Sequence, residues 1–266
     1  MAEKRSPSRH FSDLVEIMAI LRKECPWDRK QTHESIKDLM VEEIYEAIEA
    51  IDDDDPEELR KELGDLLLHV VFHTEIARES GRFDIGDVIY GIQEKLIRRH
   101  PHVFSDTRVA DSEAVVRNWE DLKMKESERR SVLQGVPDTL PALIKSQRMQ
   151  EKAAAVGFDW KSWKQAWPKL IEEIEEFREA AAQGDQHLKA SEFGDLLFSL
   201  VNVGRLAGLN AEDCLRLTNR KFKSRFQYIE EVLGGRGKQV KDVTLDEMDE
   251  IWESAKDREN GSRNQG

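Results

Sequence analysis

The sequence contains little cysteine, no long apolar run and no excess of basic residues. Its two cysteines, Cys25 and Cys214, offer neither a disulfide framework nor a metal-ligand spacing, which favours a reducing compartment and predicts a cytoplasmic protein. No stretch approaches the ~18 apolar residues that are needed to span a bilayer, and the polar segment from Met1 to His10 has no apolar core of a secretion signal. We therefore expect no contact with a membrane.

A broad basic surface is also missing, because acidic residues outnumber basic ones. Charged residues make up 36% of the chain and the formal net charge is −13, which argues against a nucleic-acid polymer as partner. The motifs G-x-S-x-G, G-x-G-x-x-G and G-x-x-x-x-G-K-[ST] are all absent, so nucleophilic serine chemistry and the common phosphate loops find no support. Small phosphorylated ligands stay compatible with this charge, since a metal ion can bridge acids to phosphate.

Apolar residues recur at intervals of three and four along most of the chain, and clusters of β-branched residues are sparse. This periodicity predicts an all-α protein. The expected helices are Phe11 to Lys23, His33 to Ile51, Glu57 to Arg78, Ile85 to Arg99, Ser112 to Lys125, Leu143 to Ala155, Trp163 to Ala182, His187 to Ala207, Ala211 to Leu233 and Leu245 to Lys256. Between two of them, Asp52 to Asp55 can end one helix and cap the next, with Pro56 at the first helical position.

Two groups of acids repeat along the chain at a constant offset of 130 residues. The first group is Glu42, Glu43, Glu46, Glu62 and Asp65, and the second is Glu172, Glu173, Glu176, Glu192 and Asp195. A single Glu-Glu-x-x-Glu is usually a solvated helix face, but both halves of the pattern occur twice in the same order and at the same separation. At helical pitch, each group places its carboxylates on the facing sides of two neighbouring helices. So many negative charges require cations, and oxygen-only ligands suit Mg²⁺ or Mn²⁺.

The duplication extends to basic and aromatic residues beyond the acids. Lys95 and Arg99 are echoed by Lys221 and Arg225, and Trp119-x-x-x-Lys123 is echoed by Trp252-x-x-x-Lys256. Drifting offsets of 126 and 133 residues fit two copies of one module whose loops differ in length. The sequence therefore predicts two helical domains, residues 1–133 and 134–266, with the boundary in the Gly- and Pro-containing stretch from Ser131 to Pro141.

Gly64 and Gly194 each precede the last aspartate of an acidic group, within predicted helices. Glycine inside a helix costs roughly 1 kcal/mol relative to alanine, so a reason for its presence is expected. Close approach of a partner helix and simple packing relief both predict that a bulkier side chain is harmful at these positions.

The paired E-E-x-x-E and E-x-x-D motifs in a tandem helical chain closely resemble those of the MazG nucleoside triphosphate pyrophosphohydrolases. Further matches are Cys25-Pro-Trp-Asp28, the segment from Arg98 to Phe104, and Val156-Gly-Phe-Asp-Trp160. The resemblance spans nearly the whole chain. It implies hydrolysis of nucleoside triphosphates to monophosphate and pyrophosphate, with Mg²⁺ or Mn²⁺, in a homodimer of helical bundles.

The resemblance also implies roles for individual residues. The metal ligands would be Glu173, Glu176, Glu192 and Asp195 in the second copy and Glu43, Glu46, Glu62 and Asp65 in the first. The catalytic group would be Glu172, Glu173, Lys221 and Arg225. Substrate would be bound by Asn219, Lys221, Arg225, Trp252 and Lys256 in the second copy and by Lys95, Arg99 and Lys123 in the first. Phe158 and Trp160 offer further aromatic faces for a base, although such residues often fill a core.

We expect the second copy to be the active one, because its acids, Asn219, Lys221 and Arg225 form the fuller set. Several alternatives stay open. The chain is a nucleotide sensor or interaction scaffold if the acids hold only a structural cation, or it hydrolyses another phosphorylated nucleotide with the same cluster. The pair His69 and His73 also leaves a zinc site open, although the pair is not duplicated with the acids. The preferred base and sugar are not indicated by any residue pattern.

Overall fold

The computed structural model describes residues 6–105 and 131–263 of the chain. Contacts divide the chain into two compact units, residues 1–119 and 120–266, and each unit is described here by itself. The division falls among residues that the structure does not describe, so the predicted boundary between residues 133 and 134 stays a prediction.

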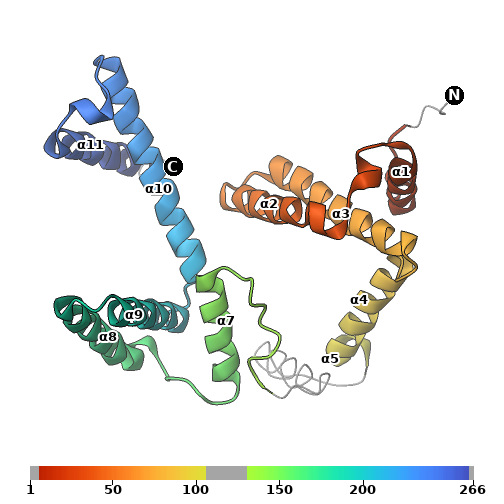
Figure 1. Cartoon of the computed structure of the whole chain (residues 1–266), viewed down its shortest axis with the longest axis horizontal. Helices are drawn as coiled ribbons and strands as arrows, with labels where there is room; N and C mark the ends of the chain where they lie inside the picture. Colours follow the sequence, from red (N-terminus) through yellow and green to blue (C-terminus); the bar gives the residue numbers. More distant parts are fainter. Residues whose placement is uncertain (1–5, 106–130, 264–266) are drawn as a thin grey trace. The chain divides into compact units, whose positions relative to one another are not determined.

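Both units are built from helices, and the described residues contain no strand (Figure 1). The first unit contains α1 (Phe11–Glu24), η1 (Asp28–Lys30), α2 (His33–Asp52), α3 (Pro56–Glu79), α4 (Ile85–Arg99) and α5 (Pro101–Phe104). The second contains α7 (Ala142–Ala155), α8 (Trp163–Gln183), α9 (Gln186–Leu206), α10 (Ala211–Gly235), η2 (Val240–Asp242) and α11 (Leu245–Arg263). The predicted all-α class is confirmed, whereas the helix predicted from Ser112 to Lys125 lies outside the described residues.

The helices α2 and α3 form an antiparallel hairpin whose turn is fixed by local capping (Figure 1). Asp54 adopts a left-handed φ of 53°, which ends α2 abruptly. The Asp55 carboxylate accepts hydrogen bonds of 3.0 Å from the backbone N–H groups of both Glu57 and Glu58, and Pro56 begins α3. This turn agrees with the prediction, and it sets the two acid-bearing helices side by side.

The hairpin of α8 and α9 uses the same device with different residues. Gly184 ends α8 with a φ of 78°, a conformation that glycine adopts without steric strain. The Asp185 carboxylate then caps α9 by accepting from the N–H groups of His187 and Leu188, at 2.8 and 3.2 Å. The two copies therefore share the capping aspartate, although only the first has the proline.

A small core and one buried ion pair fix α1 against the first hairpin. Met18 of α1 packs with Ile36, Val71 and Phe72. The guanidinium of Arg22, which is 7% exposed, donates to the carboxylate of Glu79 on α3 at 2.8 and 2.5 Å. The same guanidinium also donates to the carbonyl oxygens of Asp28 and Gln31, so it joins α1, α3 and the loop before α2.

The second unit has two cores on two helix pairs. Ala166, Leu170 and Val203 pack between α8 and α9, and Ile229, Leu233 and Ile251 pack between α10 and α11. The first of these cores holds the second acidic hairpin together. None of the described helices is long and apolar enough to cross a bilayer.

Among the described residues of each unit, the close helix approach predicted at Gly64 and Gly194 is not found. A Cβ atom built at either position meets no heavy atom within 4 Å among the described residues. Both glycines lie on exposed surfaces of their helices, where no described side chain requires a small residue.

We expect Gly64→Ala and Gly194→Ala each to raise the free energy of unfolding by about 1 kcal/mol, because alanine favours the helix and meets open space. Thermal unfolding at fixed protein concentration measures this as a rise in Tm of about 2–4 °C. A lowered Tm at either position would contradict this expectation and would indicate that another molecule packs on that face.

Candidate metal centre

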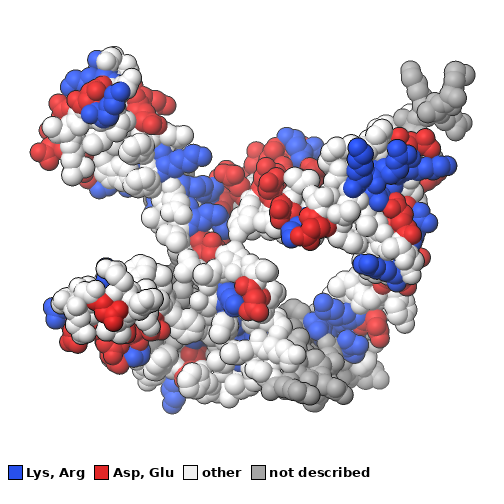
Figure 2. Space-filling model, in the orientation of Figure 1, with Lys and Arg blue, Asp and Glu red and all other residues white. Residues whose placement is uncertain are grey.

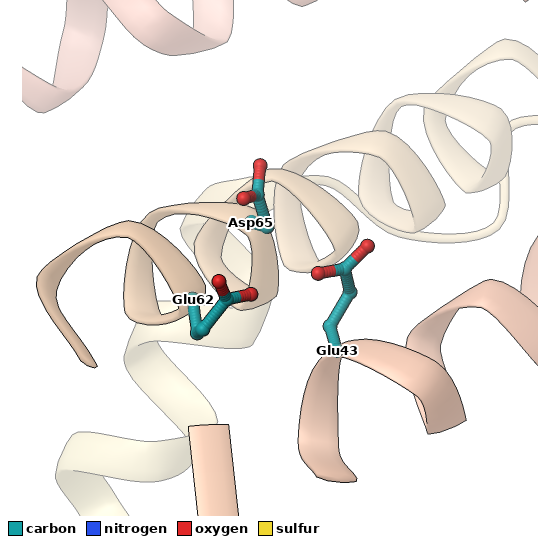
Figure 3. Close-up of side chains that lie close together, drawn as sticks. All are labelled: Glu43, Glu62 and Asp65. Carbon is teal, nitrogen blue, oxygen red and sulfur yellow. The ribbon is translucent and has the colours of Figure 1, made fainter. Parts of the chain in front are cut away.

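Three carboxylates of the first copy converge across the α2–α3 hairpin. Glu43 projects from α2 toward Glu62 and Asp65 on α3 (Figure 3). One carboxylate oxygen from each residue lies within 4.8 Å of the other two, which suits ligands of a single cation. Glu62 is 7% exposed, so one of these charges is almost fully shielded from solvent.

The electrostatics of the first cluster are unfavourable without a cation. The pKa of Glu43 is raised by burial and by the charges of Asp65 and Glu46. The pKa of Glu62 is raised by burial and by the charge of Glu46. Both shifts show that the site resists complete ionisation while no positive charge is present.

Acidic side chains continue from this cluster to the turn of the hairpin. A cavity of about 330 Å³ adjoins Glu62 and is lined by Glu46, Glu49, Ala50, Asp53, Asp55, Glu58 and Glu62. Figure 2 shows acidic side chains gathered over the α2–α3 hairpin. The first copy therefore presents an extended anionic surface rather than an isolated group of three acids.

The second copy repeats the arrangement on α8 and α9. Glu173 and Glu176 of α8 meet Glu192 of α9, again with one oxygen from each within 4.8 Å of the others. Glu173 is 5% exposed, and the pKa of Glu176 is raised mainly by burial.

A lysine distinguishes the second cluster from the first. Lys169 lies on α8 and its Nζ pairs with the carboxylates of Glu172 and Glu173 at 2.7 and 2.8 Å. These contacts raise the pKa of Lys169 above its ordinary value. The corresponding position of the first copy, 130 residues earlier, is Leu39, which has no charge to offer. The sequence analysis did not single out Lys169, although its spacing of three and four residues before the acids was the available signal.

The remaining predicted acids flank these clusters. Glu46 and Asp195 lie outside the two groups of three. The charge of Glu46 nevertheless raises the pKa of Glu43 and Glu62, although burial is the larger cause. Asp195 is exposed, one turn beyond Glu192 on α9. Glu42 is exposed on α2, and Glu172 contacts Lys169. Six of the eight predicted ligands are thus brought together in two groups.

The predicted substrate-binding residues of the second copy lie on α10 and α11. The guanidinium of Arg225 lies over the ring of Trp252, 5.4 Å from its centroid, and Trp252 also contacts Phe222 with centroids 5.3 Å apart. Lys256 pairs with Glu253 at 2.5 Å. Asn219 and Lys221 are exposed on α10. These residues form a group held by the α10–α11 pair, while the acids are held by the α8–α9 pair.

In the first copy, only some of the predicted basic residues lie in the described part of the structure. Lys95 is exposed and Arg99 is half-buried, both in the last part of α4. Lys123, like Trp119, lies outside the described residues.

The histidine pair forms a separate cluster beside the first hairpin core. His33 Nδ1 and His73 Nδ1 are 2.8 Å apart, and the two rings are stacked. The pKa values of His69 and His73 are both lowered by burial. Within residues 6–105, the group that suits a metal ion is the carboxylate cluster, and no histidine belongs to it.

Both carboxylate clusters fit a hard divalent cation. Their donors are all oxygen, they come from two helices, and burial together with mutual repulsion leaves negative charge that a cation would compensate. Two such sites per chain follow directly from the duplicated hairpin.

Comparison of the sequence with known proteins identifies the family. The model of the MazG nucleotide pyrophosphohydrolase domain matches the chain twice, at residues 31–104 and 161–229, which include both acidic hairpins. A similar protein is the nucleoside triphosphate pyrophosphohydrolase/pyrophosphatase MazG of Thermotoga maritima, 45% identical over 92% of this chain and 95% of that protein.

Two further relatives show the same extent of similarity along this chain. The nucleoside triphosphate pyrophosphohydrolase of Escherichia coli K12 is 42% identical over 92% of this chain and 97% of that protein. The uncharacterized protein YabN of Bacillus subtilis is 46% identical over 98% of this chain but only 54% of its own length. With two domain matches and relatives that align along nearly their whole length, the chain belongs to the MazG nucleotide pyrophosphohydrolase family.

Proposed function

We propose that this chain hydrolyses nucleoside triphosphates to nucleoside monophosphate and pyrophosphate, with a divalent cation held by the second acidic hairpin. The observation that carries the proposal is the convergence of Glu173, Glu176 and Glu192 in a chain that belongs to this family. Names of relatives that align over most of both chains support the activity.

Glu173, Glu176 and Glu192 would hold the cation, and Asp195, one turn along α9, would complete the set when its side chain turns inward. In the first copy Glu43, Glu62 and Asp65 would do the same, with Glu46 beside them. Mg²⁺ is the proposed ion and Mn²⁺ the alternative, because the donors are all carboxylates. A cation bound there neutralises phosphate charge and makes the attacking water more acidic.

The reaction then requires a proton acceptor beside the α-phosphate. Glu172 or Glu173 would take a proton from the attacking water, whose oxygen forms a bond to the α-phosphorus. The bond between that phosphorus and the oxygen bridging to the β-phosphate breaks, and pyrophosphate leaves. No covalent intermediate with the protein is needed, which agrees with the absence of a nucleophile motif from the sequence.

Basic side chains would bind the triphosphate and its leaving group. Lys169 already contacts Glu172 and Glu173, so its ammonium group is at the acids and can turn to a phosphate once a cation arrives. Lys221 and Arg225 share one face of α10, and Asn219 precedes them on the same helix. We propose that these residues of α10, together with Lys256, donate hydrogen bonds to phosphate oxygens of the bound nucleotide.

We assign catalysis to the second copy. The ammonium group of Lys169 lies beside the acids of the second copy. The first copy has the uncharged Leu39 at the corresponding position. The first copy, with its extended acidic surface and no equivalent of this lysine, is proposed to bind cations chiefly for stability.

We also propose that the active form is a homodimer. The outer faces of the α2–α3 hairpin expose large apolar side chains, among them Ile44, Tyr45, Leu63 and Leu67, each at least 40% exposed. A pair of helices with such a face is stabilised when a second pair covers it, as in a four-helix bundle.

Removing one acid from each copy tests the assignment of the active site. We expect Glu173→Gln to lower kcat for nucleoside triphosphates by at least about 100-fold, since a ligand to the cation is lost. Glu43→Gln is expected to retain most activity. Monophosphate and pyrophosphate are measured with Mg²⁺ and with chelator, and Glu179→Gln, also on α8, is the control. Loss of activity in Glu43→Gln alone would move the site to the first copy.

The raised pKa values predict how stability depends on pH and metal. The folded chain holds the protons of Glu43 and Glu62 more tightly than the unfolded chain, so the free energy of unfolding falls as pH rises through their raised pKa values. A bound divalent cation should offset this loss, so Mg²⁺ should raise the Tm more at pH 7.5 than at pH 5.

Neutralising one of these acids should separate repulsion from metal binding. We expect Glu62→Gln to raise the Tm in chelator and to reduce the further rise on adding Mg²⁺. The control is Glu24→Gln, at the exposed end of α1, which should change neither value. An unchanged response of Glu62→Gln to Mg²⁺ would exclude this residue as a ligand.

The proposed dimer is tested by its mass in solution. Light scattering after size exclusion should give twice the 30.8 kDa of one chain, and Leu63→Glu should shift the mass to that of the monomer. Arg60→Glu introduces the same side chain at an exposed position of α3 and should leave the mass unchanged. A wild-type monomer would refute the proposal.

A further inference from the structure

A second cavity lies in the second unit, between α7, the segment after it and α9. Its volume is about 260 Å³ and its walls are almost wholly apolar. Three aromatic rings contribute to them: Phe158 and Trp160 from the segment after α7, and Phe198 from α9. Phe158 is 81% exposed, so the cavity has an open side at which a planar ligand can enter.

Two buried amides lie among these apolar walls. Gln150 of α7 is 7% exposed, and its Nε2 donates to the carbonyl oxygen of Phe198 at 2.9 Å. Its Oε1 is buried and has no hydrogen-bond donor among the described residues. A buried carbonyl oxygen without a partner is destabilising, so a ligand that brings a donor would be bound favourably.

The second amide, Asn202 of α9, is 8% exposed and is held in a fixed orientation. Its Oδ1 accepts from Nε and Nη2 of Arg205 at 3.1 and 2.7 Å, and Arg205 is anchored by the carboxylate of Asp159. With its oxygen bound in this way, Asn202 has its Nδ2 hydrogens left to donate. The cavity is thus lined by aromatic faces and by two buried amide side chains.

The cavity and the acidic cluster lie along the same helix. Asp195, which lies one turn beyond the cluster residue Glu192, and Asn202 are seven residues apart on α9, which places them on one face and about 10 Å apart along the axis. This separation is comparable to that between the α-phosphate of a nucleotide and the outer edge of its base. A substrate whose phosphates meet the acids can therefore extend its base toward the two amides.

The first copy does not preserve this arrangement. At the offset of the duplicated acids, Asn202 corresponds to Phe72, which is 5% exposed and packs in the core with Met18 and Ile36. The guanidinium of Arg22 covers its ring, 5.7 Å from the centroid. An aromatic side chain of the protein thus stands where the second copy has an amide beside a cavity.

We propose that this cavity is the subsite for the heterocyclic base of the nucleotide, and that Gln150 and Asn202 contact the edge of the base. The inference rests on the proposed function. The base packs against Phe158, Trp160 and Phe198, an N–H of the base donates to Gln150 Oε1, and Asn202 Nδ2 donates to a ring nitrogen or carbonyl of the base. Arg205 and Asp159 act as positioning residues for Asn202.

The test compares substrates with and without a base. Steady-state kinetics with Mg²⁺ are measured for the common nucleoside triphosphates and for ribose 5-triphosphate, which keeps the sugar and phosphates. We expect Gln150→Leu and Asn202→Asp each to raise KM for nucleoside triphosphates about tenfold, the effect of one lost hydrogen bond, and to leave ribose 5-triphosphate unchanged. Asn202→Asp keeps an acceptor for Arg205, so it removes the donor without undoing the local structure.

Gln186→Leu, at the exposed start of α9, is the matched control and should alter neither substrate. Two outcomes would overturn the subsite while leaving the proposed activity in place. One is that the two test variants raise KM equally for both substrates, and the other is that wild type has the same KM with and without a base.

A binding measurement tests the subsite even if the chain hydrolyses no triphosphate. Quenching of tryptophan fluorescence by nucleoside monophosphate without metal should be saturable in wild type, weaker in Gln150→Leu and Asn202→Asp, and unchanged in Gln186→Leu. If no triphosphate is hydrolysed but this pattern appears, the proposed function fails and the base subsite stands. If wild type shows no saturable quenching and no dependence on the base, the subsite is refuted.

Discussion

Repulsion among carboxylates across a two-helix hairpin is the constraint on which the rest of this structure depends. Each copy brings carboxylate oxygens of three acids within 4.8 Å of one another, and one acid of each group, Glu62 or Glu173, is buried. The raised pKa values of Glu43, Glu62 and Glu176 record the cost of that arrangement. A folded chain retains such a cluster only if the hairpin is stable enough by other means, and if a cation compensates the charge when the site is in use.

The means of stabilisation are local caps and small cores away from the acids. Asp55 and Asp185 cap the second helix of each hairpin, and this fixes the turn and hence the register of the facing carboxylates. Apolar clusters then hold the opposite ends. The cluster of the first copy includes Phe72, whose ring lies under the guanidinium of Arg22, and that of the second includes Val203. The acids can therefore occupy the space between the helices without themselves holding the helices together.

The two copies differ in the residues that surround their mutually repelling acids. Lys169 supplies the second cluster with a positive charge from its own helix, whereas Leu39 occupies that position in the first. The second copy also has an amide at Asn202, where the first places the core residue Phe72. Both differences make the second hairpin more polar than the first.

The sequence by itself determined the helices, the capped turns and the duplicated acids, because helical period, capping residues and repeat offset are local properties. It also indicated the family through motifs that span both copies. The tertiary structure decided which acids converge, since Glu46 and Asp195 share the pattern but lie outside the groups of three. It alone showed that Gly64 has no close neighbour among the described residues and that Gln150 and Asn202 line one aromatic cavity. Those facts depend on how side chains from helices distant in sequence pack together, and no periodicity along the chain encodes that packing.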